Sequence, residues 1–178
     1  MRCSRIVGAA TVRDRVRVTV SDMRRMLSIN GDGCNQPETN MPKLDGILET
    51  CIHTTDMARA KAFYEGVLEL QPIFSDKRLT AYAVAGHNVL LVFQKGATGE
   101  TVHIPGGGVI PGHAGDGTLH VAFAIGKDQL AAWEQRLAEK GVAIEGAHTW
   151  TRGGRSIYFR DPDGHLLELA TPGLWSVY

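Results

Sequence analysis

One succession of predicted elements occurs twice in this chain of 178 residues, and that repeat restricts the fold more than any other feature. A strand, a helix and three further strands are predicted in residues 44–95 and again, about 71 residues later, in residues 118–174. A unit of about 50 residues buries too little apolar surface to be stable alone. The sequence therefore predicts an α+β fold in which two βαβββ modules pair through their sheets.

In the first module, the helix is predicted over Asp56–Leu68. Asp56 can cap its N-terminus, and apolar residues follow at steps of three and four, which places them on one helix face. Four short runs have the composition and alternation of strands. They are Ile47–His53, Gln71–Phe74, Leu79–Val84 and Val89–Phe93.

The second module has the same order. Its helix is predicted over Asp128–Lys140 and ends at Gly141, where a left-handed backbone costs glycine nothing. The run Asp161-Pro162-Asp163-Gly164 is a strong turn signal. The predicted strands are Leu119–Ile125, Val142–Ile144, Ser156–Phe159 and His165–Ala170.

A Gly- and Pro-rich linker, residues 96–117, joins the two modules. Two interpretations are equally compatible with its composition. It is either a flexible crossover or a loop that covers a pocket, because long loops in compact domains often act as lids.

Charge separates the N-terminal residues from the rest of the chain. Residues 1–43 carry seven Arg and one Lys against four acidic residues, a net charge of +4, whereas residues 44–178 have a net charge of −4. We expect residues 1–43 to form a disordered extension and residues 44–174 to form the domain. No signal-peptide centre is present in the extension.

Composition excludes several function classes. There is no apolar run of about 18 residues, so no membrane span is expected. The balanced total charge gives no reason to expect nucleic acid as a partner. Three widely spaced cysteines without a Cys-x-x-Cys pair argue against a disulfide framework and favour a reducing, cytoplasmic location.

Two segments resemble a known superfamily. Asp56, the triplet Ala62-Phe63-Tyr64 and Leu68 match a signature that follows the first strand, and residues 158–169 match a closing hairpin. Both resemble the vicinal oxygen chelate (VOC) superfamily, which includes glyoxalases, bleomycin-resistance proteins and extradiol dioxygenases. The resemblance implies a curved mixed sheet around a pocket for a small molecule, and a homodimer.

The resemblance also implies a divalent metal ion bound by Glu49, His120 and Glu168. Strand alternation agrees, since each of these side chains points away from the bulky apolar face of its strand. One imidazole and two carboxylates suit Mn²⁺, Fe²⁺, Mg²⁺, Zn²⁺ or Ni²⁺. We expect a metal-dependent lyase or isomerase whose substrate chelates the ion through adjacent oxygens, with Glu49 or Glu168 as general base.

Glu49 departs from the superfamily pattern, because metal-dependent members usually have histidine at this position. Extradiol dioxygenases use two histidines and one carboxylate, so this set of ligands favours a glyoxalase-type lyase over a dioxygenase. The alternative is a metal-free protein that sequesters a drug or metabolite. Glu49 would then form an ion pair with Arg152 or Arg155.

Several other residues are assigned from their positions. Arg152 and Arg155 flank two glycines and are predicted to bind an anionic group of the substrate. His53 shares a strand face with Glu49 and is predicted to line the pocket. Cys51, between them, is predicted to be a small core residue. Solvent exposure is expected for the five histidines of predicted turns and loops, which are His87, His103, His113, His148 and His165.

Overall fold

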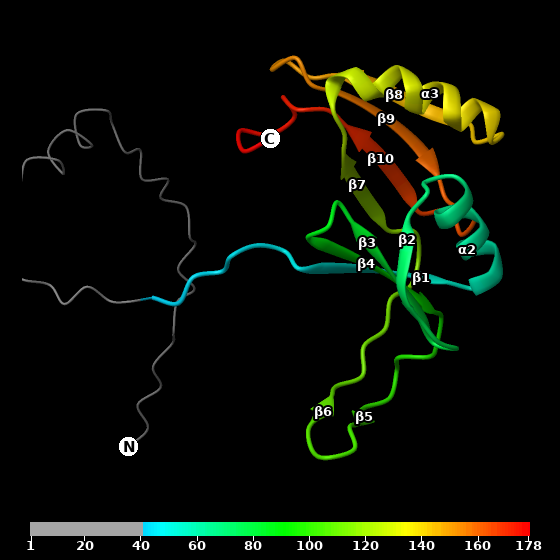
Figure 1. Ribbon diagram of the computed structural model, residues 1–178, viewed down its shortest axis with the longest axis vertical. Helices are drawn as coiled ribbons and strands as arrows, with labels where there is room; N and C mark the ends of the chain where they lie inside the picture. The colour runs from blue at the N-terminus through cyan, green and yellow to red at the C-terminus, as the bar shows by residue number, and fades with distance from the viewer. Residues whose placement is uncertain (1–40) are drawn as a thin grey trace, which may run out of the picture. The chain divides into compact units, whose positions relative to one another are not determined.

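The computed structural model describes residues 41–178, and Asp45–Tyr178 form one compact unit. Of the predicted N-terminal extension, residues 1–40 lie outside the described residues. The chain forms two four-stranded sheets. Figure 1 shows a helix beside each of them. The predicted α+β fold with two βαβββ modules is confirmed.

The first sheet has the order β1-β4-β3-β2. Its strands are β1 (Glu49–Thr54), β2 (Gln71–Ser75), β3 (Leu79–Val84) and β4 (Asn88–Gln94). β1 runs parallel to β4, and the remaining pairs are antiparallel. Helix α2 (Met57–Gly66) joins β1 to β2, and the Asp56 carboxylate caps it by accepting from the backbone N–H of Arg59.

The second sheet repeats this topology with the order β7-β10-β9-β8. Its strands are β7 (His120–Ala124), β8 (Ile144–Thr149), β9 (Arg155–Arg160) and β10 (Leu166–Ala170). β7 and β10 are parallel. A short 3₁₀ turn, η1 (Lys127–Gln129), leads into helix α3 (Leu130–Glu139), which ends before Gly141 at φ +68°.

The predicted position of the second strand in this module was wrong. Residues 142–144 were expected, whereas β8 begins at Ile144 and extends to Thr149. β8 is an edge strand whose side chains are almost all exposed, so it lacks the apolar alternation by which a strand is recognised.

The linker contains a two-stranded hairpin, β5 (Val102–His103) and β6 (Val109–Ile110). Three glycines with positive φ, residues 106–108, form its turn. Figure 1 shows the hairpin extending away from the first sheet. The linker therefore has defined structure, and its return segment passes over the first sheet, as described below.

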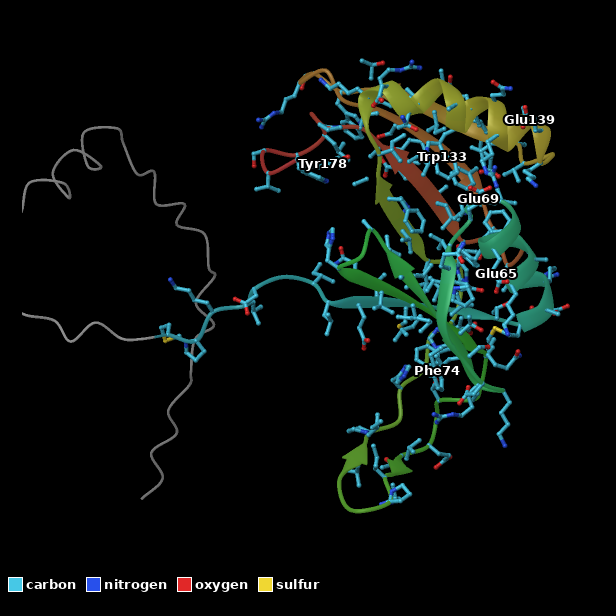
Figure 2. The ribbon with its side chains drawn as sticks, in the orientation of Figure 1. Glu65, Glu69, Phe74, Trp133, Glu139 and Tyr178 are labelled. Carbon is cyan, nitrogen blue, oxygen red and sulfur yellow. The ribbon has the colours of Figure 1, made fainter. Side chains whose placement is uncertain are left out.

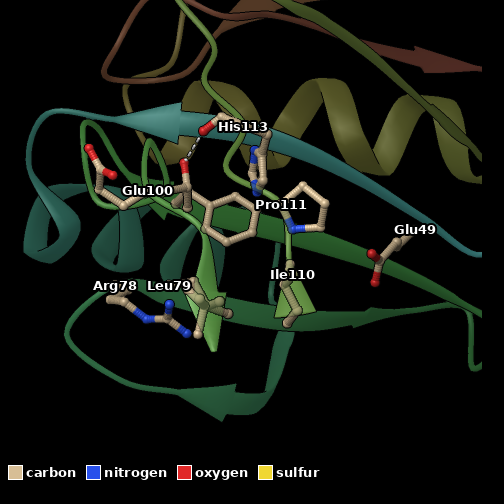
Figure 3. A pocket seen from close by; sticks show the side chains of 10 residues that line it. Glu49, Arg78, Leu79, Glu100, Ile110, Pro111 and His113 are labelled. Atoms are coloured by element: carbon tan, nitrogen blue, oxygen red, sulfur yellow. Dashed lines mark hydrogen bonds between the residues drawn. The ribbon is translucent and has the colours of Figure 1, made fainter. Parts of the chain in front are cut away.

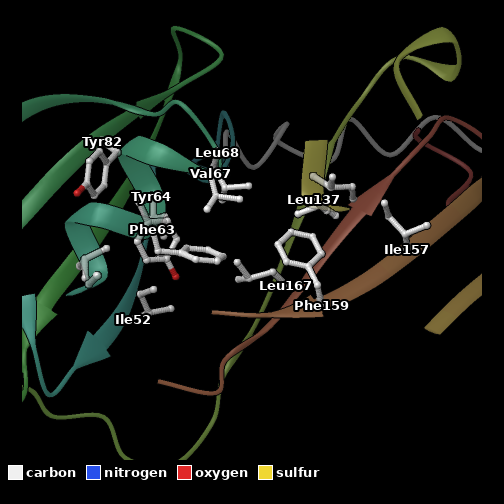
Figure 4. Close-up of a cluster of buried hydrophobic side chains, with 14 of the residues drawn as sticks. Ile52, Phe63, Tyr64, Val67, Leu68, Tyr82, Leu137, Ile157, Phe159 and Leu167 are labelled. Carbon is white, nitrogen blue, oxygen red and sulfur yellow. The ribbon is translucent and has the colours of Figure 1, made fainter. Parts of the chain in front are cut away.

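Each sheet has a face that packs on helices and a face that does not, called here the helix-free face. The helix-side residues of both sheets join side chains of α2 and α3 in one core (Figure 4). Phe63 of α2 is buried in this core, and Trp133 of α3 packs against it (Figure 2). Arg136 of α3 also donates to the backbone carbonyls of Val67 and Gly66 at the end of α2. The two modules are thus held together through their helices, which leaves both helix-free faces without a helix partner.

The β9–β10 turn provides a second connection between the modules. The Asp161 carboxylate accepts from the Tyr64 hydroxyl at 2.8 Å and from the His165 backbone N–H at 2.8 Å. Asp163 accepts from the hydroxyls of Thr54 and Thr55 at the end of β1. The contacts of Asp161 with Tyr64 and of Asp163 with Thr54 and Thr55 join residues about a hundred positions apart, and we call them the turn latch.

His165 belongs to the same region, and its predicted exposure to solvent was wrong. The side chain is buried at 2% exposure. Its Nδ1 accepts from the backbone N–H of Leu119, which fixes the proton on Nε2, and Nε2 donates to the carbonyl of His53. Burial became possible because the turn docks against β1 and supplies both partners.

No helix within residues 41–178 is both long and apolar enough to cross a membrane.

Candidate metal centre and ligand pocket

His120 and Glu168 lie together on the helix-free face of the second sheet. His120 begins β7, and Glu168 lies on the adjacent strand β10, opposite Ala122. The distance from His120 Nε2 to Glu168 Oε2 is 3.3 Å. The Glu168 side chain is only 6% exposed, and its second oxygen, Oε1, has no hydrogen-bond partner in the described part of the chain.

The orientation of His120 determines what Nε2 can do. Its Nδ1 lies 3.0 Å from the carbonyl oxygen of Leu166. A carbonyl can only accept a hydrogen bond, so Nδ1 carries a proton. In the neutral ring, Nε2 then presents a lone pair to the Glu168 carboxylate. A lone pair that faces a carboxylate oxygen is satisfied by a proton shared between the two atoms or by a bound cation.

Tyr158 lies on β9 directly across from Glu168. Burial and the negative charge of Glu168 raise the pKa of the Tyr158 phenol. Its hydroxyl therefore stays protonated at neutral pH and can donate to an oxygen bound beside Glu168. Sequence reasoning missed Tyr158, although the turn at residues 161–164 fixes the hairpin register that places it opposite Glu168.

Glu49 lies on the other module. It begins β1 on the helix-free face of the first sheet, where its side chain is exposed. Among residues 41–178, no three His, Cys, Asp or Glu side chains lie close enough together to hold one metal ion. One chain therefore brings together two of the three predicted ligands, and the complete metal site remains a prediction.

Two cavities lie beside Glu49. One, of about 640 Å³, follows the helix-free face of the first sheet and is lined also by Cys51, His53 and Leu91. The other, of about 300 Å³, lies between that face and the β5–β6 hairpin (Figure 3). Burial and the nearby Glu49 carboxylate raise the pKa of the Cys51 thiol, so it is not a thiolate nucleophile at neutral pH.

The two arginines predicted to bind substrate lie elsewhere. Arg155 is on the same side of β9 as the core residue Ile157, and its guanidinium lies 3.8 Å from Glu134 of α3. Arg152 is exposed in the turn between β8 and β9. Neither pairs with Glu49, which makes no ion pair in the described residues. Their predicted role in binding stays untested.

The donor atoms at His120 and Glu168 fit a divalent metal ion. The imidazole is oriented by a backbone carbonyl, as is usual for metal-ligating histidines, and the carboxylate has a buried oxygen without a partner. A nitrogen and carboxylate oxygens suit Mn²⁺, Fe²⁺, Ni²⁺ or Zn²⁺. These two residues could hold an ion with positions left for a third ligand and for substrate.

Two repeated modules, each with a helix-free face that carries polar side chains, define a protein of the VOC fold class. Residues 46–169 match the family model described as Glyoxalase/Bleomycin resistance protein/Dioxygenase superfamily. The chain belongs to this superfamily, as its sequence resemblance predicts.

The relatives of this chain include metallothiol transferases and a lactoylglutathione lyase. The chain is 28% identical over 130 residues to the metallothiol transferase FosB of Bacillus licheniformis. The aligned region covers 72% of this chain and 77% of the relative. The identity to FosB of Shouchella clausii is 30%, over a region that covers 72% of this chain and 81% of that relative. Among solved structures, a lactoylglutathione lyase from Agrobacterium tumefaciens superposes with a TM-score of 0.68 at 26% identity, covering 76% of this chain and 99% of that one.

Proposed function

We propose that this protein is a divalent-metal enzyme of the lyase or transferase kind, acting on a small substrate that binds the ion through adjacent oxygens. The observation that carries the proposal is the His120–Glu168 pair, in which an oriented imidazole faces a buried carboxylate with an unpartnered oxygen. The names of the relatives, a metallothiol transferase and a lactoylglutathione lyase, support the same class of chemistry.

We infer further that the site is completed between two copies of the chain. The helices of both modules share one core within a chain, so Glu49 and His120, which are exposed on the helix-free faces, are both available to a second copy. Glu49 of one copy would then join His120 and Glu168 of the other, and the protein would be a homodimer. A Glu49 contributed by the second copy would be the third ligand, which one chain alone does not bring to His120 and Glu168.

The roles of the residues follow from their environments. A bound metal ion would act as a Lewis acid on a carbonyl or similar oxygen of the substrate. The protonated Tyr158 hydroxyl would donate to a substrate oxygen beside Glu168. Glu49, as the more exposed carboxylate, would exchange between the role of metal ligand and that of general base, in which it accepts a proton from the substrate.

The test is elemental analysis of tag-free protein purified without chelator. We expect roughly one divalent ion per chain in the wild type, and loss of the ion in His120→Ala, Glu168→Gln and Glu49→Ala. His87→Ala is the matched control, because His87 is an exposed histidine of the β3–β4 turn. If the wild type neither contains nor takes up Mn²⁺, Fe²⁺, Ni²⁺ or Zn²⁺, the enzyme proposal is refuted, and metal-free ligand sequestration becomes the function to test.

Mixed dimers test the shared site separately. Glu49→Ala and His120→Ala chains are unfolded together, refolded and separated by two affinity tags. If the site spans two copies, the mixed dimer contains one intact set of ligands and binds about half of the wild-type metal. If the mixed dimer binds none while the wild type binds metal, the ligands come from one chain and the exchange proposal is wrong.

A further inference from the structure

His53 is a buried polar side chain for which the fold provides no partner. It lies on the helix-free face of β1 and is 8% exposed. Neither Nδ1 nor Nε2 has a hydrogen-bond partner in the described residues. Buried polar groups are nearly always hydrogen-bonded, and leaving one unpaired is costly. The contrast with His165, whose two nitrogens are both satisfied, shows that this fold can satisfy a buried histidine.

Aromatic rings form the walls around His53. Phe93 of β4 stacks on the imidazole with ring centroids 5.7 Å apart. His113, from the returning segment of the linker, meets it edge-on at 6.0 Å. His53 also separates two cavities, the one of about 640 Å³ that reaches Glu49 and one of about 210 Å³ beside Lys95. A planar group that enters from the larger cavity would find aromatic surfaces already in place.

A strap formed by residues 113–117 covers the imidazole. Gly115 comes so close that a Cβ added there would lie 2.5 Å from His53 Nδ1. The strap is anchored at one end, where Thr98 donates to the His113 carbonyl at 2.7 Å. At the other end Asp116 pairs with Lys95, and both of these side chains are largely exposed. An exposed ion pair contributes little stability, so the strap can lift at that end at low cost.

The surroundings also determine the charge of His53. Burial, followed by the neighbouring His113, His165 and Lys95, lowers the pKa of the imidazole. At neutral pH the ring is uncharged, with one nitrogen that donates and one that accepts. It therefore suits an uncharged partner better than a carboxylate or phosphate, which would favour the protonated ring.

We propose that His53 is a concealed ligand anchor, which hydrogen-bonds an uncharged planar group, such as an aromatic amide, when the strap lifts. The anchor depends on one chain alone and on no metal ion. The proposal for His53 can therefore be tested independently of the proposed metal site. If both exist, the larger cavity connects the anchor to Glu49, and a ligand held at His53 extends toward the metal centre.

The test uses full-length protein treated with chelator and labelled with ¹⁵N at histidine. Benzamide, benzoate and toluene are the probes, because they share a ring and differ in their polar group. We expect benzamide to shift the His53 ring ¹⁵N resonances saturably and to bind at least about tenfold more tightly than toluene, as one buried hydrogen bond requires. Benzoate should bind more weakly than benzamide.

Two variants distinguish the anchor from a packing role. His53→Phe keeps an aromatic ring and should lose the preference for benzamide over toluene while retaining toluene binding. Gly115→Ala forces the strap away from the ring, so the binding-competent open state is already populated in the free protein. We therefore expect this variant to bind benzamide several-fold more tightly. A wild-type titration in which benzamide leaves the His53 resonances unchanged would falsify the proposal, even if both variants fold poorly. Tighter binding of benzoate than of benzamide would also overturn it.

Discussion

Replacing Tyr64 with phenylalanine measures how much the turn latch contributes to stability. Tyr64 is fully buried, and its hydroxyl donates to the Asp161 carboxylate at 2.8 Å. The substitution removes one oxygen atom and leaves a buried carboxylate oxygen without a partner. A hydrogen bond to a charged group contributes about 1.5–3 kcal/mol, so we expect the free energy of unfolding to fall by about 2 kcal/mol.

The same loss can be expressed as a melting temperature. The entropy of unfolding is about 2.1 cal/mol/K per residue, so for the compact unit Asp45–Tyr178 a loss of about 2 kcal/mol lowers Tm by about 7 °C. Urea denaturation followed by circular dichroism should show a lower midpoint with an unchanged slope. An unchanged slope would indicate that the surface exposed on unfolding is the same.

Tyr82→Phe is the matched control. Tyr82 is equally buried, but its hydroxyl donates at 3.1 Å to Glu65, whose side chain is exposed. Water can replace the lost donor there, so we expect a loss of only about 0.5 kcal/mol. If Tyr64→Phe destabilises the protein no more than Tyr82→Phe, the hydroxyl–carboxylate contact does not hold the modules together, and the role of the turn latch is refuted.

Two further predictions concern the turns of the second module. Gly154→Ala would place a methyl group 2.6 Å from the backbone of Gly173 and should destabilise the protein by about 2 kcal/mol in thermal melts, whereas Gly146→Ala, with its nearest neighbour at 3.8 Å, should change stability by less than about 0.5 kcal/mol. Burial alone would raise the pKa of Asp163, but hydrogen bonds from the threonines at the end of β1 outweigh it and lower that pKa. A carboxyl whose folded pKa is lowered stabilises the protein above its unfolded pKa of about 3.9, and the contribution disappears as pH falls further. Asp163→Asn should therefore flatten the dependence of Tm on pH below about pH 5, and an unchanged dependence would contradict this account.

Local pattern predicted most of the fold. The alternation in β1, β3 and β7 and the capped spacing of α2 depend on near neighbours in sequence, and those elements lie where they were expected. β8 was misplaced because an exposed edge strand needs no apolar alternation. The linker hairpin was missed for a related reason, since its two strands are only two residues long.

The site was less predictable because it depends on contacts between distant segments. The meeting of His120 and Glu168 follows from parallel neighbouring strands and could be anticipated. The burial of His165 could not, since its partners come from the docking of a distant turn. Likewise, the apolar alternation along β1 shows on which face of the strand Glu49 lies. It does not show which other sheet that face contacts.

The separation of the two faces of each sheet has a consequence for how this architecture can change over time. Side chains such as Ile52 and Leu167 face the helices and provide cohesion, whereas Glu49 and His120 occupy the opposite faces and make few contacts with the core. Substitutions at these two exposed positions therefore change the available chemistry at little cost in stability. A change between glutamate and histidine at the exposed position 49 therefore has little effect on the stability of the fold, whatever it does to the chemistry of the site.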